Sequence, residues 1–400
     1  MFVGIAGGIA FPILPIVGLR AGLSLPFIGL ILAANRIARI FASPIVGMLS
    51  DRLGGRRLLL AGMGTQIAVM SLYLAGVAFA HPGSCFLLAR LLHGPGSACV
   101  FVAAQVLALH AGGKAHGGRS AGLVRAAMTS GMPLGLVLGG LLSARFGDRV
   151  TFAAAILAVV VATVAAFVLV PDLRAEARAR VDLRSTLRTM ADRRILALGA
   201  LNFATFFSAQ GTILTTMVLF GGARGLAWGG LGNQATASLA MGALVLVSAG
   251  ASLVAGRLGD RHHAHASFAL AGLAVLIAGL LVTTFASSPA TLFGAVALVG
   301  GGMGAMNPCL LALIGLFVAS ELSGRAVGAI QLLGDVGGAL GPIVGATLLA
   351  HSTGAPFLLS AVVVLCVLPI AARLVRAERM ATAAHAAVAV TETALPQDDL

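Results

Sequence analysis

Long apolar stretches separated by short polar connections dominate the chain. Each stretch can cross a hydrocarbon core, for which a helix needs about 20 residues. Strands of a membrane barrel would be about half as long and would alternate in polarity. We therefore predict an all-α membrane protein with twelve membrane-spanning helices. The predicted spans are 2–19, 26–47, 58–80, 84–108, 120–143, 150–170, 195–220, 231–255, 266–287, 290–317, 325–349 and 355–375.

The chain contains an internal repeat. The Gly-x-x-x-Asp-Arg stretch that begins at Gly47 recurs at Gly256, and Pro133 recurs as Pro342. Both pairs have the same offset, since 256 − 47 = 209 and 342 − 133 = 209. A repeated six-helix half is what a secondary transporter with two lobes and a site at the midplane requires.

The repeat predicts two pseudo-symmetric six-helix bundles on either side of one long polar connection. The first bundle covers residues 1–170 and the second covers 195–376. The linker at 171–194 is either a helix lying on the membrane surface or a solvated segment. We expect the Ala-rich tail at 377–400 to be a disordered cytoplasmic segment.

Composition excludes most other protein classes. Hydrophobic residues make up 59% of the chain and charged residues 10%, against about 25% charged in typical soluble proteins. The net charge of +13 does not indicate nucleic-acid binding, because eighteen basic residues flank the spans on one side and four on the other. This asymmetry predicts a multi-pass protein of the bacterial inner (plasma) membrane with both termini in the cytoplasm. Its first partner is therefore the lipid bilayer.

We find no sequence signal for an enzyme, a metal site or a cofactor. The four cysteines fall inside apolar spans without metal-ligand spacing. The cluster of His262, His263 and His265 is interpreted as a solvated loop, since converging ligands are missing. Sequences of the H-E-x-x-H and Walker types do not occur.

Two motifs carry a resemblance to a known family. The second predicted connection contains Gly47-Met-Leu-Ser-Asp51-Arg52-Leu-Gly54-Gly55-Arg56-Arg57. It resembles the G-x-L-x-D-R-x-G-R-R-x loop of the major facilitator superfamily, with Gly55 at a usually basic position. The fourth span contains Arg90-Leu-Leu-His93-Gly94-Pro95-Gly96-Ser97-Ala98, which resembles the R-x-x-x-G-x-G-x-A motif that this family uses in proton coupling.

The resemblance implies a cytoplasmic latch between the two bundles. Asp51 would contact the start of the eleventh helix at Gly324-Arg325, and its repeat Asp260 would face the start of the fifth helix near Arg119. The alternative for this loop is a plain basic membrane anchor. The latch candidates are Gly47, Asp51, Arg52, Gly54, Arg56, Asp260 and Arg261.

Polar residues within the spans are the candidates for the transport path. Arg90, His93, Ser97 and Gln105 share one helical face, and an arginine within a span is costly and usually functional. The alternative is that Arg90, about 9 Å from the outer edge, extends to the interface.

The seventh predicted span has a polar stripe. Asn202, Thr205, Thr212 and Thr216 fall within an arc of roughly 80° at 100° per residue, whereas Gln210 lies off it. We predict that the stripe faces the central cavity; the alternative is hydrogen bonding to its own helix.

Two further sets of candidates lie in other spans. Asn307 belongs to another cavity helix by resemblance, and Pro12, Pro15, Pro133 and Pro342 are hinge candidates.

One carboxylate, Asp335, lies deep in a predicted span, at a depth of about 15 Å. Arg36 of the second span reaches a similar depth, and the resemblance implies that the second and eleventh helices pack across the two lobes. We predict a contact of Asp335 with Arg36 or Arg39. A contact that opens during the cycle would let Asp335 carry a proton, whereas a permanent contact would be structural. The proton-coupling candidates are Asp335, Arg36, Arg39 and Arg90.

Together these features predict a monomeric, proton-coupled secondary transporter that exports a small organic solute. Phe11-Pro12-Ile-Leu-Pro15 and the glycines around Gly341-Pro342 resemble elements of proton-driven drug exporters. The alternatives are an uptake permease for a metabolite and a non-transporting sensor of the same fold.

Overall fold

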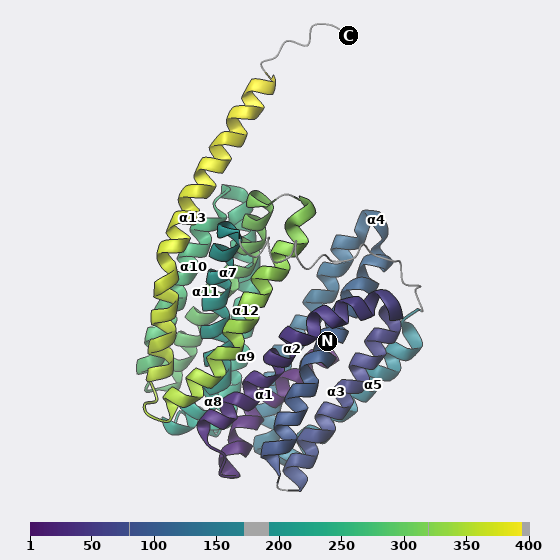
Figure 1. Ribbon diagram of the computed structural model, residues 1–400. Helices are drawn as coiled ribbons and strands as arrows, with labels where there is room; N and C mark the ends of the chain where they lie inside the picture. Colours follow the sequence, from purple (N-terminus) through teal and green to yellow (C-terminus); the bar gives the residue numbers. More distant parts are fainter. Residues whose placement is uncertain (80, 172–191, 319, 394–400) are drawn as a thin grey trace.

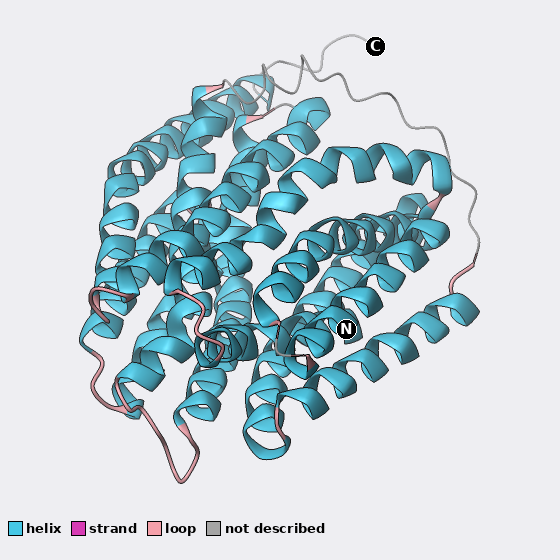
Figure 2. Ribbon diagram, turned by 60° about the horizontal axis from the view of Figure 1, so that its bottom comes forward, coloured by secondary structure: helices cyan, strands magenta, loops and turns pink. Residues whose placement is uncertain are grey.

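The computed structural model describes residues 1–79, 81–171, 192–318 and 320–393, with some side chains left out, among them those of Asp51 and 109–123. In these ranges every regular element is a helix (Figure 2). Along the chain the elements are α1 (Phe2–Arg20), α2 (Leu25–Leu53), α3 (Gly55–Ala78), α4 (Pro82–Phe146), α5 (Asp148–Leu169), α7 (Arg193–Thr205), the π-helix η1 (Phe206–Ile213), α8 (Leu214–Ala223), α9 (Asn233–His262), α10 (His265–Phe285), α11 (Pro289–Phe317), α12 (Ser320–Leu349) and α13 (Ala355–Thr393).

The predicted fold class is confirmed. Within the described residues, 11 helices are long and apolar enough to cross a membrane, and Ser130–Phe146 is a shorter apolar helix. One span, Arg193–Ala223, is built from α7, η1 and α8 in succession. The linker that we predict to be interfacial or solvated falls on residues 172–191, outside the described residues.

Helix α4 joins two predicted spans, 84–108 and 120–143, into one continuous element. The Arg90 guanidinium lies 4.8 Å from the Phe11 ring centroid, and the backbone at Met132 lies against Gly8. A straight helix would separate residues 90 and 132 by about 63 Å, yet both lie beside neighbouring turns of α1. The chain therefore turns back between them. The sequence predicts a connection at 109–119 between these two spans, but the backbone there is helical. No proline stands between residues 96 and 132 to end the helix.

The helices form two lobes, α1 to α5 and α7 to α13, which lie side by side (Figure 1). The core of the first lobe includes Tyr73, whose ring contacts those of Phe86 and Phe152. The core of the second lobe extends to the first, because it includes Leu136 of α4 and Phe11 of α1 packs against it. The two lobes thus share apolar contacts near the molecular centre.

Contacts between the lobes are concentrated at one end. There a Cβ at Gly29 of α2 would lie 2.5 Å from the carbonyl oxygen of Pro342 in α12. Gln234 of α9 donates a hydrogen bond to the Ser143 hydroxyl of α4 at 2.9 Å.

Toward the other end the lobes diverge (Figure 1). Gly47 of α2 and Gly328 of α12 have open space around the position of a Cβ. By the predicted orientation, the separated end is the cytoplasmic one.

Helix α13 continues to Thr393, where the sequence predicts a disordered tail from residue 377. Alanine, the strongest helix former, is abundant in this segment. Glu378 is 3% exposed, and its carboxylate accepts hydrogen bonds from the backbone N–H groups of His265 and Ala266, each at 2.8 Å. The segment thereby caps the start of α10, where unpaired N–H groups favour an acceptor.

We expect Glu378→Ala to lower the free energy of unfolding by about 1–3 kcal/mol, because two buried N–H groups lose their acceptor. Thermal unfolding of the purified protein measures the change. Arg379→Ala, at the exposed neighbouring residue, is the matched control and should have little effect. Equal melting temperatures of the two variants would contradict a stabilising role of Glu378.

Candidate functional site

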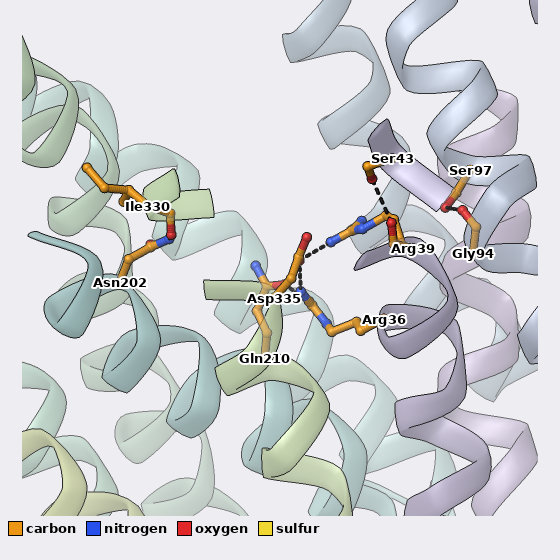
Figure 3. A network of polar contacts seen from close by, with 9 residues as sticks. All are labelled: Arg36, Arg39, Ser43, Gly94, Ser97, Asn202, Gln210, Ile330 and Asp335. Atoms are coloured by element: carbon orange, nitrogen blue, oxygen red, sulfur yellow. Dashed lines mark hydrogen bonds and ion pairs between the residues drawn. The ribbon is translucent and has the colours of Figure 1, made fainter. Parts of the chain in front are cut away.

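The described residues include one ion-pair network that joins the two lobes. Asp335 of α12 is 6% exposed, and its Oδ1 accepts a hydrogen bond from Nη1 of Arg36 in α2 at 2.9 Å. Arg39, one turn further along α2, donates to the same oxygen (Figure 3). Both predicted contacts are therefore present, and they are simultaneous.

Gln210 of η1 completes this network, although the polar-stripe analysis leaves it outside the site. Its Oε1 accepts a hydrogen bond from Nη2 of Arg36 (Figure 3), and the Phe206 ring lies 5.3 Å from the Arg36 guanidinium carbon. A π-helix has more residues per turn than an α-helix and often occurs at functional sites. The π-helical turn of η1 changes the direction of the residues in it, so 100° per residue misplaces Gln210.

Glycines of α12 make room for the network. A Cβ at Gly338 would lie 2.7 Å from both Cζ and Nε of Arg36, so a larger residue would displace the guanidinium. A Cβ at Gly341 would lie 2.5 Å from the carbonyl oxygen of Phe207, and a longer side chain would separate α12 from η1. Close approach of the backbones thus requires residues without a Cβ.

Arg90 lies nearby in the first lobe and has no ion-pair partner among the described residues. It is 2% exposed, and its guanidinium carbon lies over the Phe11 ring, 4.8 Å from the centroid. Its charge and that of Arg39 both act electrostatically on Arg36. The alternative that Arg90 extends to the membrane interface does not fit its burial, because the guanidinium lies over the Phe11 ring in the interior.

The polar stripe of the seventh span does not face an open cavity in this structure. Asn202 donates to the Ile330 carbonyl oxygen at 2.9 Å, and Thr205 donates to the Leu201 carbonyl oxygen at 2.9 Å. Thr212 and Thr216 are buried, and they bond carbonyl oxygens of their own span. The stripe packs against the glycines of α12, because short polar side chains can satisfy themselves on backbone carbonyls.

We expect single cysteines at Thr205 and Thr216 to react with a hydrophilic thiol reagent more than about tenfold more slowly than one at exposed Ser24, because reaction requires local opening. The measurement needs a background in which the four native cysteines are replaced by alanine. Fast reaction at both positions, slowed by a transported solute, would instead place the stripe on the transport path.

The other cavity candidates are dispersed. His93 is partly buried, and its Nδ1 has no partner among the described residues. The Ser97 hydroxyl donates to the Gly94 carbonyl oxygen of its own helix at 2.9 Å. Gln105 is partly exposed and Asn307 is exposed. The hinge candidates lie inside helices: Pro12 and Pro15 in α1, Pro133 in α4 and Pro342 in α12.

The first latch motif is described only in part, since the side chain of Asp51 lies outside the described residues. Gly54 has a φ of 77°, which suits glycine at the turn between α2 and α3. A Cβ at Gly55 would lie 2.9 Å from Leu107, so close packing explains glycine at a position that is basic in the family motif. Arg56 donates to the Phe167 carbonyl oxygen at 2.6 Å, while Arg52 is exposed.

The repeated latch motif has a local partner. Oδ1 of Asp260 lies 3.4 Å from Nε2 of His265, at the start of α10, and Arg261 is exposed. The side chain of Arg119, which the resemblance pairs with Asp260, lies outside the described residues. Both latch contacts between lobes therefore stay predictions.

Comparison with known proteins places these features in one family. The family described as Major Facilitator Superfamily matches the chain over residues 1–233 and 229–395, which include both lobes. No curated protein matches the chain.

Proposed function

The chain belongs to the Major Facilitator Superfamily, whose members are membrane carriers and not enzymes, and from this membership we propose that it exports a small organic solute by proton-coupled transport. The two lobes would rock about the midplane and expose the solute site to each side in turn. We further propose that both termini face the cytoplasm, as the basic loops predict.

The observation that carries the proton-coupling proposal is the position of Asp335 between the lobes. Its two ion-pair partners both belong to α2 of the first lobe, whereas Asp335 belongs to α12 of the second. An opening of the lobes at this depth would separate the carboxylate from both guanidinium groups. A carboxylate without a cationic partner in a membrane interior is costly and takes up a proton.

The network thus supports a cycle in which Asp335 is ionised while the lobes are joined and protonated while they are apart. Gln210, which also accepts a hydrogen bond from Arg36, belongs to the second lobe as well. Separation of the lobes would therefore free Arg36 from both of its partners. Release of the proton would then accompany re-formation of the network.

Transport of candidate solutes by the purified full chain in proteoliposomes tests this function. We expect an imposed pH gradient to drive solute flux, and an imposed solute gradient to drive a flux of protons. Solute flux that does not depend on the pH gradient would refute proton coupling. Absence of any flux would support the alternative of a non-transporting sensor of the same fold.

A further inference from the structure

One edge of the Arg90 guanidinium carries unpaired hydrogen-bond donors inside the first lobe. Its Nε and Nη2 atoms are buried and have no hydrogen-bond partner among the described residues. In a guanidinium group these two atoms lie on the same edge, and their N–H groups point in parallel. This edge matches the two oxygens of a carboxylate or phosphate and binds them in a bidentate manner.

The surrounding charges do not balance. Arg36, Arg39 and Arg90 contribute three positive charges, and Asp335 is the one carboxylate that the described structure pairs with this group. The cluster therefore carries an excess of two positive charges when Asp335 is ionised. Buried charges without a counter-ion are strongly unfavourable, so an anion would be stabilised here.

We propose that Arg90, together with Arg36 and Arg39, binds the acidic group of a small organic anion, and that this anion is the transported solute. The inference rests on the proposed transport function and specifies its substrate class. The guanidinium carbon of Arg90 lies over the Phe11 ring, and that of Arg36 lies over the Phe206 ring. Arg90 keeps a free donor edge, whereas the Nη atoms of Arg36 donate to Asp335 and Gln210. The two rings offer apolar surface to the body of the anion.

An anionic substrate determines whether the solute and the proton move in the same direction or in opposite directions. Among the described residues, the charged and titratable groups around Asp335 are Arg36 and Arg39 of α2 and, beyond them, Arg90 and His93 of α4. The residue that η1 places at this network, Gln210, is uncharged. The anion competes with the Asp335 carboxylate for Arg36 and Arg39. Protonation of Asp335 therefore strengthens anion binding, and reciprocally so. A proton and an anion would leave the cell together, driven by the gradient of the anion, instead of exchanging.

Binding to the purified full chain tests the substrate class. The probes are benzoate, phenylacetate, succinate and phenyl phosphate, each compared with a neutral amide or alcohol and with an amine of similar size. Thermal unfolding measures the concentration at which each compound stabilises the protein. We expect stabilisation by at least one anion, and little or none by its neutral and cationic analogues.

Variants locate the site. We expect Arg90→Gln to weaken binding of the stabilising anion by about tenfold or more without lowering the melting temperature of the free protein, because its two buried N–H groups have no partner to lose. Arg20→Gln, with the same charge change at an exposed surface pair, should leave anion binding unchanged. A large drop in the melting temperature of free Arg90→Gln, with unchanged anion binding, would assign Arg90 a structural role and overturn the proposal.

Further outcomes separate this proposal from the transport function. Equal stabilisation by neutral or cationic analogues, or no stabilisation by any anion, would overturn the anion site while leaving transport open. Anion binding without flux in proteoliposomes would support the site and refute transport. Proton flux opposite to anion flux would overturn the joint movement that the competition predicts.

Discussion

Asp335→Asn is expected to abolish transport driven by a pH gradient while exchange of solute across the membrane continues. Asparagine keeps the shape of the side chain and one hydrogen-bond acceptor for the arginines, but it cannot ionise. For one proton per solute, a gradient of one pH unit supports a solute ratio of about tenfold. The variant should reduce this ratio to about one, measured as solute accumulation in proteoliposomes.

Two further variants make this result decisive. Asp148→Asn removes a carboxylate at the start of α5 that pairs with Arg20 of α1 at 3.3 Å and accepts a hydrogen bond from Ser143, and gradient-driven transport should survive this change. If Asp335→Asn does not insert into the membrane, the combination with Arg39→Gln restores the charge count of the network. Gradient-driven transport in either inserted Asp335 variant would contradict the carrier role.

Gly29→Leu is expected to shift the protein away from the conformation described here. A Cβ at Gly29 would lie 2.5 Å from the Pro342 carbonyl oxygen and 2.9 Å from the Ala346 Cβ, and backbone atoms cannot move aside without separating α2 from α12. Overpacking of this kind costs about 1–3 kcal/mol, which changes a conformational ratio by about 5- to 150-fold. The distance between spin labels at exposed Ser24 and Ser352 should increase, and the transport rate should fall.

The matched variant is Gly47→Leu, on the same helix. Open space surrounds Gly47 in this conformation, so leucine fits here and would obstruct only the state in which the separated ends come together. The label distance should therefore stay at its shorter value. Gly64→Leu, at an exposed position of α3 without close neighbours, should leave the distance distribution unchanged. Equal shifts in Gly29→Leu and Gly47→Leu would contradict the assignment of tight and open ends.

The fold and the central ion pair could be predicted from the sequence because both follow from simple rules. Span length defines the helices, and the rise per residue places Asp335 and Arg36 at the same depth. The sequence alone does not decide whether Arg36 or Arg39 contacts Asp335, since the two arginines stand on neighbouring turns of one helix. The structure uses both arginines on one carboxylate oxygen.

Gln210 and Glu378 could not be found in the same way. The π-helical segment that directs Gln210 toward Arg36 breaks the regular rotation of 100° per residue, and no residue pattern marks where it begins. Glu378 belongs to an Ala-rich segment without a recognisable motif, yet its partner is the backbone at the start of α10. Such long-range contacts depend on tertiary packing, which local sequence does not encode.

The ion pair divides α2 into two arms of unequal length. Counted from Arg36, the tight contact at Gly29 lies seven residues away, since 36 − 29 = 7, and the open position Gly47 lies eleven away, since 47 − 36 = 11. At the rise of an α-helix these arms measure about 10 Å and about 16 Å. A rigid tilt that parts the short arm by 1 Å swings the long arm by about 1.6 Å. A small separation of α2 from α12 on one face of the membrane would therefore accompany a larger movement of α2 that closes the other face.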